Sequence, residues 1–167
     1  MSNTFNNWNC YQHNVFYSLL NDLLIKVEAL HHLPTSDFFA NDSVKFLQFI
    51  YQSITTEIPN DPDAPRFRAG KNVLGEQTTS WRRIKYRRRY RLFFKFFSSN
   101  KSIFYCWFND RNTLRKAGAS TDCYEVFKKL LSSCVGSTFG ELNKSSTLNW
   151  SIPDEFKKDG NEKNNPS

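Results

Sequence analysis

A central stretch of the sequence concentrates arginine and lysine, the side chains that bind phosphate groups. Residues 66–95 contain eleven cations and a single acid, Glu76, which gives this stretch a net charge of +10. The whole chain carries +7, so the rest of it sums to −3. Like charges this close together repel one another, and such a cluster is typical of a surface that meets a polyanion. The eleven cations are Arg66, Arg68, Lys71, Arg82, Arg83, Lys85, Arg87, Arg88, Arg89, Arg91 and Lys95.

Eight of these eleven cations are arginine, whose planar guanidinium matches a phosphate better than the point charge of lysine does. We therefore expect contact with nucleic acid and none with a membrane. One alternative is a solvated basic surface that only aids solubility. Another is a polybasic patch that binds a membrane, but the amphipathic anchor or lipidation motif that usually accompanies such a patch is missing from the sequence.

Other kinds of chemistry find little support in the sequence. The cysteines are irregularly spaced and form no CxxC pair, and the three histidines lie far from most of them: Cys10, Cys106, Cys123 and Cys134. A metal site needs several ligands that converge, so we expect no metal and no cofactor, and reduced cysteines with a structural role. Glycine-rich phosphate loops and the HExxH and GxSxG motifs are also missing.

The chain shows no sign of export or membrane insertion. Its first residues are polar and uncharged, unlike a signal peptide. The most hydrophobic stretch, residues 92–97, is short and contains Lys95. We therefore expect a cytoplasmic protein.

The first part of the chain has the periodicity of helices. Residues 11–32 and 38–57 both repeat apolar side chains at helical spacing, and Pro34 with the polar residues after it separates them. This pattern predicts two antiparallel helices joined by a short turn. Three prolines in residues 58–65 should end the second helix.

The second part of the chain has the composition of strands. Residues 81–86, 89–97 and 102–108 are rich in aromatic and branched side chains, and Arg87-Arg88 and residues 98–101 are short enough to be turns. A last helix should start near Ser120-Thr121-Asp122, with an apolar stripe formed by Tyr124, Phe127, Leu130 and Leu131.

These elements predict an α+β fold, in which an N-terminal helical hairpin packs on a small, twisted, antiparallel-rich sheet that is followed by a C-terminal helix. We expect one domain at residues 1–135 and a polar, partly disordered C-terminal extension at residues 136–167.

Strand alternation sorts the central charges by face. On the first strand Arg83 and Lys85 share a face. If the apolar face of each strand packs on the helices, these two residues and Arg91 converge on one open sheet surface. Both faces of the middle strand carry aromatic residues, so its outer face stays undecided.

Several segments of the chain occur in an order that one known family shares. They are Pro65-Arg66-Phe67-Arg68-Ala69-Gly70-Lys71, Trp81-Arg82-Arg83-Ile84-Lys85-Tyr86, Arg89-Tyr90-Arg91-Leu92-Phe93-Phe94 and Trp107-Phe108-Asn109-Asp110-Arg111-Asn112-Thr113-Leu114-Arg115, followed by Thr121-Asp122 and Tyr124-Glu125-Val126-Phe127. Over residues 7–131 the sequence resembles the YhaV family of type II toxins. It departs from the family pattern at Arg87-Arg88-Arg89, where small residues are common, and beyond Leu131.

The resemblance implies a RelE-like fold and a metal-independent endoribonuclease toxin, an mRNA interferase that inhibits translation and growth. Its substrate would be mRNA, in association with the ribosome. Its partner would be a PrlF-like antitoxin with an AbrB-type domain, and it would contact operator DNA only through that antitoxin.

RelE-like enzymes keep two cations on one strand, an arginine on the next, an arginine in the following loop and a tyrosine on the last helix. By this resemblance the cation pair is Arg83 and Lys85, and the other three are Arg91, Arg115 and Tyr124. The two strand arginines would hold the phosphate, Lys85 would act as a base or a further cation, and Arg115 would hold the leaving group. Tyr124 would stack on a base or donate a proton.

A wider set of residues is expected to contact RNA around the cleaved bond: Arg66, Arg68, Lys71, Arg82, Arg87, Arg88, Arg89, Lys95 and Asn109. Structural roles remain as alternatives: a surface salt bridge for Arg115, core packing for Tyr124 and turn formation for Asn109. For the whole protein, the alternative is a non-catalytic RNA-binding module or a degenerate, toxin-like regulatory protein. We expect Trp81 and Trp107 to lie in the core.

Overall fold

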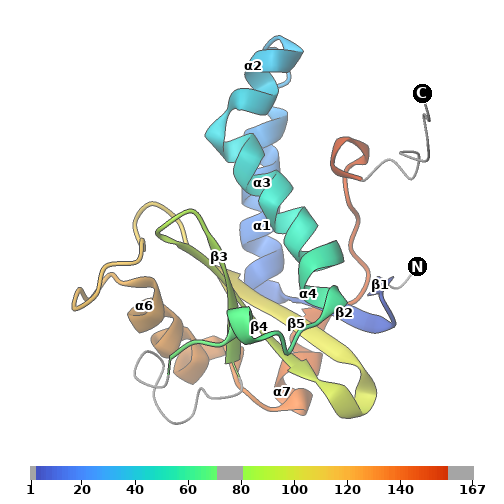
Figure 1. The fold of residues 1–167 in the computed structure, drawn as a ribbon, viewed down its shortest axis with the longest axis vertical. Helices are drawn as coiled ribbons and strands as arrows, with labels where there is room; N and C mark the ends of the chain where they lie inside the picture. Colours follow the sequence, from blue (N-terminus) through green and yellow to red (C-terminus); the bar gives the residue numbers. More distant parts are fainter. Residues whose placement is uncertain (1–2, 71–80, 158–167) are drawn as a thin grey trace.

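A computed structural model describes residues 3–70 and 81–157 and has an α+β fold with a mixed sheet (Figure 1). The strands lie in the order β1-β2-β5-β4-β3, and β6 pairs with β2. Only the β2–β5 pairing is parallel among these strands. The strands are β1 (Thr4–Phe5), β2 (Trp8–His13), β3 (Trp81–Tyr86), β4 (Tyr90–Phe97), β5 (Ser102–Phe108) and β6 (Ser146–Thr147). The helices are α1 (Asn14–Glu28), α2 (Thr35–Ala40), α3 (Asp42–Gln52), α4 (Ile58–Asn60), α6 (Cys123–Leu130) and α7 (Phe139–Lys144).

The three strands predicted in the second half of the chain are confirmed. β3 and β5 have the predicted bounds, and β4 begins one residue later than predicted because Arg87–Arg89 form the turn. Arg87 takes a left-handed backbone conformation in this turn, with φ of 49°. The pairing of β3 with β4 sets Lys85 opposite Arg91, and it sets Arg83 opposite Phe93.

The start of the first helix was predicted wrongly. Residues 11–13 belong to β2, which pairs with the central strand β5 over Asn9–Gln12. The helix begins only at Asn14, after His13, whose ring Nδ1 accepts a hydrogen bond from the backbone N–H of Val15. Pairing with a strand distant in sequence therefore overrides the helical spacing at this position.

The second predicted helix is interrupted and then extended. Asn41 is extended and separates α2 from α3, because its side chain accepts a hydrogen bond from the N–H of Ser43 and caps the second of them. After α3 a π-helical turn at Ser53–Glu57 leads into α4, which contains Pro59. Proline has no N–H to donate, and the wider turn before it accommodates this loss.

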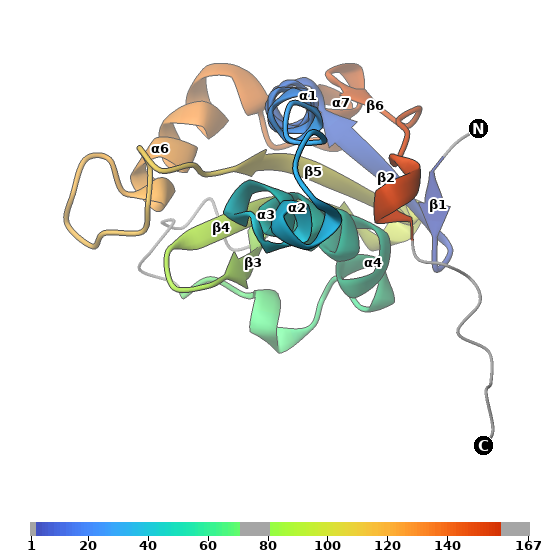
Figure 2. The same ribbon diagram turned by 90° about the horizontal axis from the view of Figure 1, so that it is seen from above.

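Helices cover both faces of the sheet. One core cluster joins α1 and α3 to the face that carries Leu92 and Phe94 of β4. A second cluster joins α6 and Leu142 of α7 to the opposite face, which carries Phe93. α1 and α3 lie side by side in both views, and α6 lies across β5 from α3 and α4 (Figure 2). Aromatic residues on both faces of β4 are therefore explained by two cores, with Trp81 and Trp107 in the second.

The segment after α6, which the sequence assigned to a polar extension, packs against the domain as far as it is described. β6 pairs with the end of β2 through Gln12 and His13. Trp150 is buried, and its ring N–H donates to the carbonyl oxygen of Cys10 over 2.9 Å. Residues 136–157 thus contribute to the core. The expected tail from residue 158 onward lies outside the described residues.

Asn109, directly after β5, fastens the following loop to β4. Its side-chain oxygen accepts from the N–H of Arg91 over 2.7 Å, and its amide nitrogen donates to the carbonyls of Arg89 and Thr113, both over 2.9 Å. The residue is fully buried. A buried amide with all these partners gives the loop a single conformation.

Replacement of Asn109 by aspartate should destabilise the protein by about 3 kcal/mol, because a carboxylate would face two carbonyl oxygens in a buried place. Urea unfolding measures this loss. Asn112→Asp, in the exposed part of the same loop, is the control and should change the unfolding free energy by less than about 0.5 kcal/mol. Equal losses in both variants would contradict the role assigned to the buried amide.

Candidate active site

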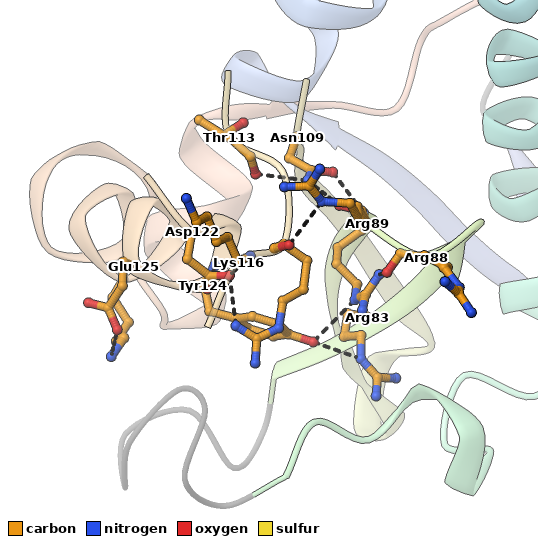
Figure 3. A network of polar contacts seen from close by, with 12 residues as sticks. Arg83, Arg88, Arg89, Asn109, Thr113, Lys116, Asp122, Tyr124 and Glu125 are labelled. Carbon is orange, nitrogen blue, oxygen red and sulfur yellow. Dashed lines mark hydrogen bonds and ion pairs between the residues drawn. The ribbon is translucent and has the colours of Figure 1, made fainter. Parts of the chain in front are cut away.

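The five residues that the resemblance singled out lie together at one end of the sheet, beside the start of α6. Figure 3 labels Arg83 and Tyr124 among them. The strand pairing puts Arg83 and Lys85 of β3 on the same face as Arg91 of β4. α6 and its Phe127 cover the middle of this face. The face is therefore not the open sheet surface that we expected, and the cations gather where α6 begins.

The hydroxyl of Tyr124 is the meeting point of two arginines. Its oxygen accepts a hydrogen bond from Nε of Arg83 over 3.0 Å and a longer one from Nε of Arg91 over 3.4 Å. The guanidinium of Arg115 lies over the tyrosine ring, 4.9 Å from its centre. Three positive side chains therefore surround one aromatic residue on the first turn of α6.

Carbonyl oxygens hold the two strand arginines. Nη1 of Arg83 donates to the carbonyl of Arg66 over 2.8 Å, and Nη1 of Arg91 donates to those of Tyr90 and Arg88 over 2.8 and 3.1 Å. The two residues are only 8% and 7% exposed. Within the described parts of the chain, their Nη2 groups have no hydrogen-bond partner. Neither Nη2 is among the fully buried polar atoms without a partner. These N–H groups are free to bind an anion.

Asp122 is the carboxylate in direct contact with this group of cations. It forms an ion pair with Arg115 over 2.7 Å and also accepts from the N–H of Lys116 and of Tyr124. Burial, the largest effect, raises the pKa of Asp122. The hydrogen bonds from Arg115 and from the two backbone groups outweigh burial, so the pKa lies below its ordinary value and the carboxylate is ionised at neutral pH. The surface salt bridge considered for Arg115 is thus a contact with a buried carboxylate.

Lys85 is the exposed cation of the group. The charge of Arg83 is the largest cause that lowers the pKa of Lys85, followed by partial burial and by the charges of Arg91 and Arg115. A larger fraction of this amine is neutral near physiological pH than for an isolated lysine. A neutral amine can accept a proton, so Lys85 has the property that a general base needs.

Tyr124 does not offer a stacking surface to a base. The residue is 4% exposed, its ring meets Phe93 edge to face, and Arg115 covers it. Packing and polar contact are thus combined in one side chain. The sequence left these two roles as alternatives, and it gave no sign that the hydroxyl would accept from two arginines.

Some residues from the wider RNA-binding set point away from the site. Lys95 donates to the carbonyl of Ser137 and lies near the rings of Trp81 and Phe97, so it is used in packing. Arg82 is on the other face of β3, where it pairs with Asp63. Asn109 is buried, and its amide is used up by backbone groups. These three expectations are corrected because strand parity and local packing turn the side chains away from solvent near the site.

Other members of the wider set are exposed at the surface. Arg66, Arg68 and Arg87 each pair with a carboxylate at the surface, and exposed pairs of this kind contribute little to stability. Arg88 and Arg89 lie in the turn between β3 and β4, and Arg89 donates to the carbonyl of Arg115 over 3.2 Å. Lys71 lies outside the described residues.

The cysteine beside the site is a protonated thiol. Burial, and then the charge of Asp122, raise the pKa of Cys123 to about 11, so this thiol next to Tyr124 stays protonated. Cys10 and Cys106 are buried free thiols, as expected for structural residues. Among residues 3–70 and 81–157, no three side chains of the metal-binding types lie close enough together to hold an ion. Nor does any helix in these ranges have the length and apolar character to cross a membrane.

Comparison with known proteins agrees with the resemblance seen in the sequence. The model of one family, described as a toxin with endonuclease activity, of toxin-antitoxin system, matches residues 10–143. Toxin YhaV of Escherichia coli O6:H1 (strain CFT073) is 36% identical over 127 residues, which cover 75% of this chain and 82% of that protein. Ribonuclease toxin YhaV of Escherichia coli K12 is 35% identical over the same shares of the two chains. No solved structure matches. The matched residues include all five side chains of the candidate site, and the chain belongs to the YhaV toxin family.

Proposed function

We propose that this chain is the toxin of a type II toxin–antitoxin system, an endoribonuclease that cleaves mRNA and so inhibits translation and growth. The observation that carries the proposal is the gathering of Arg83, Lys85, Arg91 and Arg115 around Tyr124, with Asp122 as the carboxylate in contact with them. Such an excess of positive charge, with N–H groups left free, fits an anion that enters from outside. The name of the K12 relative, a ribonuclease toxin, supports RNA as the substrate.

The reaction would use the 2′-hydroxyl of the substrate as the nucleophile. Attack on the neighbouring phosphorus forms the new O–P bond, and the bond to the 5′-oxygen of the next nucleotide breaks. Negative charge builds up on the phosphate oxygens in between. The free Nη2 groups of Arg83 and Arg91 would bind these oxygens, and their carbonyl contacts keep both guanidinium groups in place before the substrate arrives.

Two proton transfers remain to be assigned. Lys85, whose pKa is lowered by its neighbours, would take the proton from the 2′-hydroxyl. Arg115 would bind the leaving nucleotide, because it is the most exposed of the three arginines in the group. Its side chain is 29% exposed. The oxygen of Tyr124 accepts from two arginines, so its own O–H points away from them and would donate the second proton to the leaving 5′-oxygen, which leaves a 2′,3′-cyclic phosphate and a 5′-hydroxyl. None of these steps calls on a metal or a cofactor.

The family membership supports the wider biological proposal. We infer a RelE-like fold from three adjacent antiparallel strands followed by a helix that carries the tyrosine. We further infer cleavage of mRNA on the ribosome, in the cytoplasm, and neutralisation by a PrlF-like antitoxin with an AbrB-type domain. Operator DNA would be contacted only through that antitoxin. The exposed arginines at 66, 68 and 87–89 would bind the RNA backbone on either side of the cleaved bond.

Arg91→Ala should slow RNA cleavage at least about 100-fold, on the order of 3 kcal/mol in the barrier, because a fixed donor to the phosphate is lost. Cleavage is measured by end mapping of free and of ribosome-bound RNA, and circular dichroism checks the fold. Lys157→Ala removes an equal charge from an exposed surface pair outside the RNA-binding set and should change the rate less than about threefold. A folded Arg91→Ala protein that cuts at the normal rate would remove the proposed site. RNA binding by the natural protein without any cleaved product would instead favour the non-catalytic RNA-binding module.

The cleavage rate should rise with pH by about tenfold per unit and then level off, because only neutral Lys85 accepts a proton. The plateau should begin below the ordinary pKa of lysine, since the neighbouring cations favour the neutral amine. Arg83→Gln removes the largest of these charges and should move the plateau to higher pH. Single-turnover rates between neutral and alkaline pH measure this shift. A plateau that stays in place would exclude Lys85 as the base.

Excess EDTA should leave the rate of cleavage unchanged within about twofold, because fixed cations supply all the charge stabilisation in the proposed reaction. The measurement compares the natural protein with and without chelator on the same RNA. Loss of activity that Mg²⁺ or Mn²⁺ restores would assign the protein to another class of nuclease.

A further inference from the structure

Asp122 has no role in the reaction proposed above, yet it contacts three parts of the site. We propose that Asp122 is a positioning residue for RNA cleavage, which fixes the guanidinium of Arg115 at the leaving-group side. This inference rests on the proposed function. It adds an anionic residue to a site whose charged groups proposed to meet the phosphate are all cations.

The carboxylate of Asp122 connects the loop after β5 to α6 (Figure 3). Its Oδ1 accepts from Nη1 of Arg115 over 2.7 Å and from the backbone N–H of Lys116 over 2.6 Å. Its Oδ2 accepts from the N–H of Tyr124 over 3.1 Å and so caps α6. The side chain is 3% exposed. One buried group therefore fixes the end of the loop, the start of the helix and the direction of the arginine.

Arg115 depends on this contact more than the other arginines depend on theirs. The side chains of Arg83 and Arg91 project from β3 and β4 and are held by carbonyl oxygens and by the hydroxyl of Tyr124. The side chain of Arg115 projects from a loop, and the backbone of Arg115 forms hydrogen bonds with Arg89. In the described parts of the chain, its guanidinium has only the Asp122 carboxylate as hydrogen-bond partner, together with the ring of Tyr124. A long side chain with many rotamers is thus directed by a single ion pair.

The charge of Asp122 makes its role distinguishable from that of an RNA contact. A carboxylate beside a phosphate site repels the substrate, so its removal should strengthen RNA binding. A positioning role has the opposite effect on the chemical step, because a misplaced catalytic group slows the reaction strongly. Binding and cleavage should therefore respond in opposite directions when Asp122 is replaced.

The first test is Asp122→Ser, since serine is also a favoured N-cap and can still accept from the N–H of Tyr124. Its shorter side chain no longer reaches Arg115. We expect the single-turnover cleavage rate to fall about 30-fold. We expect the affinity for a fully 2′-O-methylated RNA of the same sequence, which has no free 2′-hydroxyl and cannot be cut, to rise about twofold to fivefold. Thr138→Ala, which removes the N-cap of the distant helix α7, controls for lost helix capping and should leave cleavage unchanged.

The second test is coupling to Arg115. If Asp122 acts through this arginine, Asp122→Ser should slow cleavage by less than about twofold in an Arg115→Ala background, although it slows the natural protein about 30-fold. A residue that only stabilises the fold would slow both proteins by the same factor. Thermal unfolding of all four proteins shows whether each is folded at the assay temperature.

The possible results separate this inference from the proposal on which it rests. If the natural protein does not cut RNA, both the endoribonuclease and the positioning role fall. If it cuts RNA and the two variants with serine at position 122 show equal slowing relative to their parents, only the positioning role falls. Normal cleavage by folded Asp122→Ser would overturn it as well. Slower cleavage with tighter binding and lost coupling supports it.

Discussion

Two guanidinium groups meet at one phenolic oxygen, and the rest of the site depends on this contact. Arg83 and Arg91 are nearly buried and carry like charges, which is costly in the interior of a protein. Carbonyl oxygens and the hydroxyl of Tyr124 accept hydrogen bonds from both guanidinium groups, but these neutral acceptors do not cancel the two positive charges. A carboxylate at the same place would have cancelled the charge that a phosphate needs. The two buried charges therefore stay available for the phosphate that the proposed reaction requires.

The two cores on either side of the sheet make this arrangement rigid. Phe127 of α6 packs against Trp81 and Phe93, and this contact holds α6 where it brings Tyr124 to the cations. β4 is covered from both sides, so Arg91 has little freedom to move. The amide of Asn109 ties the loop to the same strand, and Asp122 ties that loop to α6. Packing far from solvent thus determines where the exposed groups Lys85 and Arg115 lie.

Much of the site was predictable because its residues follow local rules. Strand alternation placed Arg83, Lys85 and Arg91 on one face, and the polar Ser120-Thr121-Asp122 marked the start of α6 correctly. Lys95 obeys the same alternation, yet it lies further along β4, beneath residues that follow α6. Only the packing of distant segments distinguishes it from the other cations.

The elements that the sequence did not predict are those that depend on long-range partners. β2 has a sequence whose spacing also suits a helix, and it is a strand because β5 lies beside it. The contribution of residues 136–157 was likewise hidden, because their polar composition gives no sign of the pairing with β2 or of the place of Trp150. The buried partners of Asn109 and Asp122 belong to the same class, since an exposed loop residue and a buried anchor look alike in sequence.

The bond between Trp150 and Cys10 spans 140 residues and has a consequence for biosynthesis. Strand β2, which carries Cys10, is completed only by a segment translated 140 residues later, so this part of the sheet must wait for that segment. Contacts between residues so far apart in sequence form slowly, because a long loop must close before the contact can stabilise the fold. Premature termination before residue 146 would therefore release a chain in which β2 lacks both β6 and Trp150, and unpaired strand edges of this kind promote aggregation.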